Sequence, residues 1–317
     1  MSAIPVQPTP IRRTFGEWLR RNPITLKEMR SRMRGRRAFA VLTVNALLLG
    51  GLVSLIYMTY AANTQTFNSP SNLQSLGKLI FATAVGMQLL ITCFTSSSSA
   101  VGAISSERER QTFELLRTTL LPARSLVLGK LAAAVLFNLL VILSAIPIAS
   151  LSFFFGGVTL EEIAIASVFL IVTALAFSSI GLFFSSLLRR TSQATAVSTV
   201  VTLILLFGIP VFMLIIQGLL STMTYYGGSR TGMTSVEAEL TRNFVIWLLI
   251  SISPISAGVA TLALLLENKT ALSMTLTLSN GTSVSYPAPW IAYTVVYLLL
   301  SVLLIALSVR AVKRVDK

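Results

Sequence analysis

Long apolar runs constrain the fold of this chain more than any other feature of its sequence. Six of them are long enough to cross roughly 30 Å of hydrocarbon as helices. They occupy residues 38–60, 79–104, 127–155, 162–187, 194–218 and 289–309. Because a backbone in hydrocarbon must satisfy its own hydrogen bonds, we expect an all-α polytopic membrane protein with six transmembrane helices.

The composition supports this interpretation and excludes several chemistries. Hydrophobic residues make up 54 % of the 317 residues, and charged residues make up 11 %. The chain has one cysteine, Cys93, and no histidine, which excludes an intrachain disulfide, serine-histidine catalysis and a histidine zinc site. We therefore expect no catalytic residue, no metal site and no cofactor in this chain.

Positive charges determine the expected sidedness. Lys and Arg number 25 against 11 Asp and Glu, an excess that in a polytopic chain marks cytoplasmic loops rather than a nucleic-acid site. Residues 1–37 are rich in arginine and should be cytoplasmic, which also places residues 105–126 and the turn at Arg189 and Arg190 inside. The basic tail, residues 310–317, is cytoplasmic only if the number of crossings is even.

A seventh apolar run, residues 243–266, is interrupted at Ser253 and Pro254. A seventh crossing would put the basic tail outside, so we expect two short helical halves broken at this dipeptide. They would re-enter the membrane from the outer side or lie beneath the outer interface. A true span is the alternative.

Residues 272–286 predict a small external β-hairpin, since apolar and polar residues alternate around an Asn-Gly dipeptide. A two-residue turn there pairs Thr277 with Val284 and Leu278 with Ser283. Neither face of such a hairpin is purely apolar, so it needs a neighbour, for which the halves of 243–266 are the nearest candidate.

Residues 11–36 combine arginines with apolar residues at largely helical spacing, among them Phe15 and Trp18. This pattern predicts an amphipathic interfacial region. Asn22 and Pro23 are typical of an N-cap and a first helical residue, so we expect two helices with an elbow there. A polybasic anchor to acidic membrane lipids is an alternative that can hold at the same time.

The cytoplasmic segment 106–124 has the densest charges of the chain, and they are of mixed sign. Phe113, Leu116 and Leu120 fall at i, i+3 and i+7, which puts an apolar edge on a short helix that Pro122 would end. Such a helix can dock in a groove of a partner, whereas a solvated loop has less need of an apolar stripe.

Several polar residues lie within the predicted spans, and most of them are expected to hydrogen-bond a neighbouring helix rather than to line a path. Small residues between 95 and 102 would also permit close helix approach. The polar candidates are Asn45, Gln88, Thr92, Ser96 to Ser99, Asn138, Ser178 and Ser179.

Four features follow one another around the cytoplasmic segment. They are an acid-basic stretch at Glu107 to Arg110, a Thr-Phe-Glu-Leu-Leu core at 112–116, Leu121-Pro122, and Leu128-Gly129-Lys130 opening the third span. Together they resemble the type-2 permease subunit of ATP-binding-cassette (ABC) transporters. The stretches Asn22-Pro23 to Arg32 and Ser253-Pro254 also resemble that family, so the resemblance covers nearly the whole chain.

The resemblance implies a coupling helix at 107–121, docked in a cleft of an ATP-hydrolysing subunit, and a connecting helix at 11–36 against the same partner. The implied docking residues are Glu107, Glu109, Thr112, Phe113, Glu114, Leu115, Leu116, Arg117, Leu120 and Pro122. The implied connecting-helix residues are Phe15, Trp18, Asn22, Pro23, Lys27, Glu28 and Arg30. Two permease chains would assemble with two ATPase subunits, which bind ATP and Mg.

The chain itself has no phosphate-binding loop, because Gly129-Lys130 is followed by Leu131 and residue 124 is an arginine. We expect a non-enzymatic permease subunit that drives export, possessing one transmembrane domain in a prokaryotic cell membrane with both termini cytoplasmic. That domain comprises a cytoplasmic region 1–37, five spans in 38–218, an external region 219–288, a last span 289–309 and a tail 310–317.

Two other functions are compatible with parts of the sequence. A non-transporting membrane adaptor would use the basic N-terminus and the cytoplasmic helix to anchor a soluble partner. An intramembrane hydrolase is suggested only by the serines in the spans, and the chain lacks a histidine and a Gly-x-Ser-x-Gly elbow. The short external region and the scarcity of charge in the spans favour an amphipathic or apolar cargo.

Overall fold

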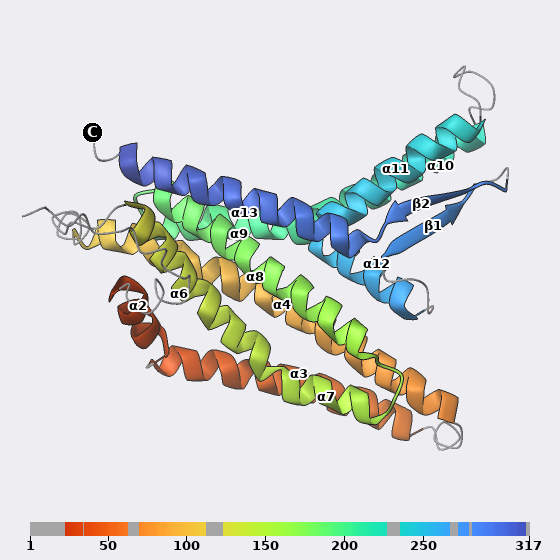
Figure 1. Cartoon of the computed structure of the whole chain (residues 1–317), viewed down its shortest axis with the longest axis horizontal. Coiled ribbons are helices and arrows are strands. Elements are labelled where there is room, and N and C mark those ends of the chain that lie inside the picture. Colours follow the sequence, from red (N-terminus) through yellow and green to blue (C-terminus); the bar gives the residue numbers. More distant parts are fainter. Residues whose placement is uncertain are drawn as a thin grey trace, which may run out of the picture.

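The computed structural model of the chain describes residues 23–33, 35–62, 70–111, 123–226, 235–266, 272–278 and 281–314. Long helices lie beside one another in a bundle, with a short helix at one end and a two-stranded sheet at the other (Figure 1). Among the described residues, six helical segments are long and apolar enough to cross a membrane, as the sequence predicts.

The helical segments agree with the predicted runs to within several residues, except where a helix extends beyond its apolar run. The helix of the second predicted span, α4, reaches past 79–104 at both ends. Glu107 and Glu109 therefore lie on its last turn. The third run contains a break at Ala145, just before Pro147. The helices are α2 Pro23–Met33, α3 Arg36–Ala61, α4 Pro70–Glu109, α6 Ala123–Ser144, α7 Ile146–Phe154, α8 Leu160–Leu187, α9 Thr191–Leu203, the π-helix η2 Ile204–Gly208, α10 Ile209–Tyr226 and α13 Pro289–Arg314.

The two ends of the bundle differ in charge, and we name them for it. At the basic end lie α2, the end of α4, the start of α6, the turn between α8 and α9, and the end of α13 (Figure 1). At the hairpin end lie the sheet and the helix ends on the opposite side of the bundle. The segments predicted to be cytoplasmic thus gather at one end, as an even number of crossings requires.

The centre of the bundle is formed by α4, α8 and α13. The rings of Tyr293 and Tyr297 stack at 4.2 Å, and Tyr293 also stacks on Phe169 at 4.3 Å. Toward the basic end, a Cβ at Gly181 of α8 would meet the backbone oxygen of Ser97 on α4. A glycine is therefore required where these two helix backbones touch.

Several of the polar residues within the spans bond neighbouring helices, as expected, whereas Ser179 bonds within its own helix and the buried hydroxyls of Thr92 and Ser96 have no partner among the described residues. The Asn45 and Gln88 amides both donate to the carbonyl oxygen of Val141, at 3.3 and 3.4 Å. Asn138 donates to the Ser99 hydroxyl at 3.0 Å. These side chains join α3, α4 and α6 in the interior of one chain.

The run 243–266 is broken where the sequence predicts. Helix α11, Ser235–Ile252, and helix α12, Pro254–Leu266, are separated by Ser253, and their axes turn by 109°. Proline cannot continue the preceding helix without loss of a backbone hydrogen bond, which explains the position of the break. So large a turn fits two helical halves at one end of the bundle better than a straight span.

The hairpin forms from β1, Ser273–Thr277, and β2, Ser283–Pro287, but the predicted register is wrong by one residue. Thr277 lies opposite Ser283 instead of Val284. The amide of Leu278 donates to the Thr282 carbonyl at 2.8 Å, which closes a three-residue loop with Gly281 at φ +81°. Asn-Gly serves such a loop as well as a two-residue turn, because its glycine takes the left-handed position in both.

The corrected register also sorts the hairpin by polarity. Met274 now lies opposite Tyr286, and Thr275 lies opposite Ser285, so apolar and polar pairs alternate between the faces. The hairpin does lean on α11, as expected. The Trp247 indole donates to the Pro287 carbonyl at 2.9 Å, and its ring stacks on Tyr286 at 5.7 Å.

Candidate functional site

Helix α2 begins at Pro23, the residue predicted to open the second helix of the N-terminal region. It packs against α6 at the basic end. Its buried face consists of Thr25, Glu28, Met29 and Arg32, while the apolar Leu26 and Met33 are exposed. The contact of α2 with the bundle is therefore largely polar, which apolar periodicity could not reveal.

Lys130, on the second turn of α6, is the centre of this contact and is only 1 % exposed. Its ammonium donates to the Ala103 carbonyl at 2.6 Å, to Glu107 Oε1 at 2.7 Å and to Glu28 Oε1 at 3.2 Å. An ammonium has three N–H donors, so this set satisfies it completely. One buried cation thus joins α2, α4 and α6, and we call Glu28, Glu107 and Lys130 the Lys130 cluster.

Arg32 extends the cluster. Its Nε lies 3.4 Å from Glu28 Oε2, and its Nη1 donates to the Ser99 carbonyl of α4 at 2.7 Å. Burial raises the pKa of Glu28, but the charges of Lys130 and Arg32 and their hydrogen bonds outweigh it and hold this pKa below its ordinary value. Glu28 therefore stays ionised at neutral pH and remains a partner for both cations.

Glu109 makes a second connection at the basic end. Its Oε1 accepts from the Thr191 backbone N–H at 2.9 Å, and its Oε2 accepts from the Thr191 hydroxyl at 2.7 Å. Thr191 is the first residue of α9, where backbone N–H groups have no partner within the helix and a carboxylate is favourable. Glu109 therefore ties the end of α4 to the start of α9.

These contacts surround the segment predicted to dock on a partner. Glu107 and Glu109 are its first residues, at the end of α4, and Lys130 follows it on α6. A displacement of the segment would be passed through charged contacts to α2, α4, α6 and α9 together.

The predicted site residues divide into described and undescribed ones. Glu107 and Glu109 lie on α4, and Pro23, Lys27, Glu28 and Arg30 lie on α2, with Lys27 and Arg30 exposed. The other predicted residues lie outside the described part of the chain. They are Phe15, Trp18, Asn22, Thr112, Phe113, Glu114, Leu115, Leu116, Arg117, Leu120 and Pro122.

Sequence reasoning missed the role of Lys130. It noted the residue only as part of Leu128-Gly129-Lys130 and found no charge deep in the first five spans. Two signals were available, since a lysine near the start of an apolar run is costly unless paired, and Glu28 and Glu107 were both expected on the same membrane side. The separation of these residues along the chain hid the pairing.

Comparison with known proteins agrees with the architecture. The family model described as ABC-2 family transporter protein matches residues 23–315, from the first residue of α2 almost to the end of the chain. The chain therefore belongs to this family, and it is a multi-pass membrane permease of the ABC type. A comparison with curated proteins finds no match.

Proposed function

We propose that this permease couples ATP hydrolysis in separate subunits to export, and that the Lys130 cluster is the joint through which the coupling runs. The observation that carries this proposal is the ammonium of Lys130, which is bonded at once to α2, α4 and α6. The basic end is then cytoplasmic, as the positive-inside rule requires.

Two ATPase subunits would bind residues 107–121 and the exposed face of α2. Lys27 and Arg30 are exposed on that helix and remain available to a partner, whereas Glu28 is engaged with the bundle. A docked subunit thus meets one surface made from both predicted segments. Closure of the two ATPases around ATP would push these surfaces together and tilt the attached helices.

A second permease chain would complete the path. The span formed by α9, η2 and α10 has 11 % of its apolar stretch buried in this chain, against 61 % for α8. Lipid or another copy must cover the exposed face. We place the second chain there. The path between the chains would then be bordered by α9, which is connected to α4 through the contact of Glu109 with Thr191.

The test is affinity purification of the tagged chain from its own membrane in mild detergent, followed by mass identification and an ATPase assay. We expect a near-stoichiometric ATPase subunit that is lost from the Glu114→Arg variant, because charge reversal on the docking helix disrupts a charge-rich groove. Lys313→Met, on an exposed residue of α13, is the matched control and should retain the subunit.

Two outcomes would contradict the proposal. Retention of the ATPase by Glu114→Arg would show that docking does not use the predicted helix. Recovery of the chain with an unrelated soluble protein and no ATPase would favour the membrane adaptor.

A further inference from the structure

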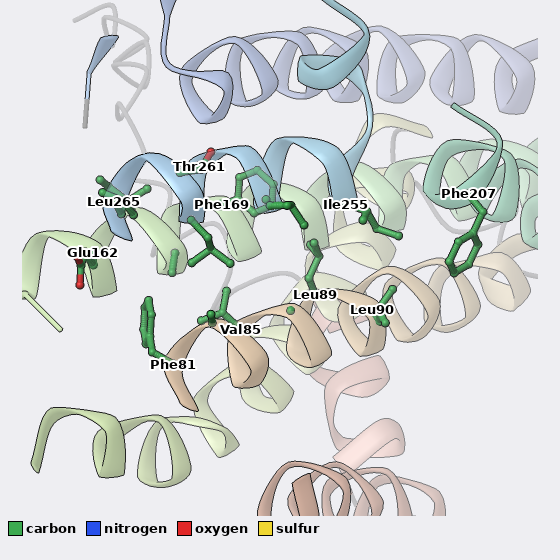
Figure 2. A pocket seen from close by; sticks show the side chains of 17 residues that line it. Phe81, Val85, Leu89, Leu90, Glu162, Phe169, Phe207, Ile255, Thr261 and Leu265 are labelled. Carbon is green, nitrogen blue, oxygen red and sulfur yellow. The ribbon is translucent and has the colours of Figure 1, made fainter. Parts of the chain in front are cut away.

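A cavity of about 260 Å³ lies between α4, α8, α12 and the π-helix η2 (Figure 2). It is near the hairpin end, away from the Lys130 cluster. Phe81, Val85 and Leu89 line it from α4, and Phe169 lines it from α8. Ile255 and its neighbours on α12 close the third side, so the cavity exists because the helix breaks at Ser253 and turns over the bundle.

The cavity is elongated along α4. In Figure 2, Phe81 and Glu162 lie at one end, while Leu90 and Phe207 lie at the other. Phe81 and Leu90 are nine residues apart along α4, which corresponds to about 13.5 Å of helix rise. Phe207 belongs to η2, whose wider turn presents this ring at the inner end.

The two ends differ in polarity. Glu162 borders the outer end, where it forms the capping box that opens α8 with Thr159. An adjoining small hollow, which shares Phe81 and Glu162 with the cavity, is also lined by Lys78. Beyond this end the lining is apolar apart from Thr261, whose hydroxyl donates to the Ala257 carbonyl within its own helix.

Small residues leave the cavity unfilled. A Cβ at Gly86 would have no protein atom within 4 Å, and one at Gly258 would meet Leu89 and Phe169 only at ordinary contact distances. The cavity also reaches the outside of the chain, because its lining residues Phe207 and Val259 are 48 % and 62 % exposed. It is therefore an apolar recess accessible from the surroundings of the helices.

An acyl chain matches these properties. An apolar cavity stays dry and takes apolar guests, and the medium around these helices is itself hydrocarbon. A long narrow recess with charges at its outer end fits a molecule with an apolar tail and a polar head. Compact apolar guests would gain nothing from the charged end.

We propose that this cavity binds one acyl chain of a membrane phospholipid, inserted tail-first with its polar group beside Glu162 and Lys78. The bound chain fills the space under α12 and holds the broken helix against α4 and α8. The site goes beyond the proposed ATPase coupling, and it shares no residue with the Lys130 cluster, so either of these two proposals can fail while the other stands.

Native mass spectrometry of the delipidated full-length chain, titrated with dimyristoyl-phosphatidylethanolamine, tests the proposal. Gly86→Leu adds a side chain at a position that lines the cavity and where a Cβ has no protein atom within 4 Å, so bound lipid should fall roughly tenfold or more. Gly51→Leu is the matched control, because a Cβ there also has no atom within 4 Å but lies on the exposed face of α3. It should bind lipid as the unmodified chain does.

A second titration keeps the test independent of any folding defect. The unmodified chain should bind the dimyristoyl lipid and retain little of the dihexanoyl form, whose tails are too short to reach Phe207. Equal retention of lipid by Gly86→Leu, Gly51→Leu and the unmodified chain would mean surface lipid only and would overturn the proposal. Equal retention of the long and short lipids would overturn it as well.

Discussion

The basic end and the hairpin end of this bundle are held together by different forces. At the basic end, Lys130 of α6 uses all three of its donors on α2 and α4, and Glu109 binds the start of α9. At the hairpin end, aromatic rings stack around Trp247 and a cavity separates α12 from α4. One end is joined by directional charged contacts, and the other contains an apolar cavity.

Two glycines differ in the space around them, although the hairpin end has tight positions as well, since a Cβ at Gly77 would meet the backbone oxygen of Gly156. At Gly181 a Cβ would collide with the backbone of α4, whereas at Gly86 it would meet nothing. Contacts without free space transmit a displacement, and loosely filled ones absorb it. Under the proposed coupling, force would enter through the charged contacts of the basic end, and the space around the cavity would allow α12 to rearrange.

Removal of the Lys130 charge should have the largest effect on stability, because it removes the charged contacts that distinguish the basic end. Lys130→Met leaves Glu28 and Glu107 facing each other without their shared cation, which should cost on the order of 3 kcal/mol in unfolding free energy. Thermal unfolding in detergent would measure the loss. Lys313→Met serves as the control and should stay near the unmodified protein, whereas an equal loss in both variants would remove the special role of Lys130.

The two glycines provide a paired prediction of intermediate size. Gly181→Ala forces α8 away from α4 and should destabilise the protein by about 1–3 kcal/mol. Gly86→Ala introduces the same methyl group into open space and should be neutral or stabilise by up to about 1 kcal/mol through helix propensity. If both variants unfold at the same temperature, the two positions do not differ in packing.

The smallest expected effect concerns pH. The pKa of Glu28 is lower in the folded state than its ordinary value of 4.5, so the folded protein binds this proton less readily than the unfolded chain does. The stabilising contribution is complete above that value and is lost as the pH falls below it through the folded pKa. The difference in unfolding midpoint between the unmodified protein and Glu28→Gln should therefore be smaller at pH 4 than at pH 7. An equal difference at both pH values would contradict this prediction.

Much of this fold could be predicted because each membrane helix requires a long apolar run, which is visible in the sequence. Uninterrupted apolar runs predicted the six spans, and Ser253-Pro254 predicted the break between α11 and α12. The hairpin register could not be settled, because Asn-Gly fits loops of two and of three residues. Here backbone geometry at Leu278 and Thr282 decided the outcome.

The candidate site was less accessible to sequence reasoning. Local patterns drew attention to residues 107–121, but the pairing of Lys130 with Glu28 depends on how α2 packs against α6. Apolar periodicity did not reveal this contact, because Leu26 is exposed while Thr25 is buried against the bundle. The cavity could not be predicted from the sequence either, because it depends on how α4, α8, η2 and α12 pack against one another.

The most direct test of the account is a distance measurement across the Lys130 cluster in the complex with the ATPase subunits. Spin labels at Ser31→Cys on α2 and Arg124→Cys on α6, both exposed, would be compared by pulsed electron paramagnetic resonance in a Cys93→Ser background. The account predicts one narrow distance distribution that ATP does not change, and a broad one in Lys130→Met. Equally narrow distributions in both proteins would contradict the claim that this cluster joins the helices.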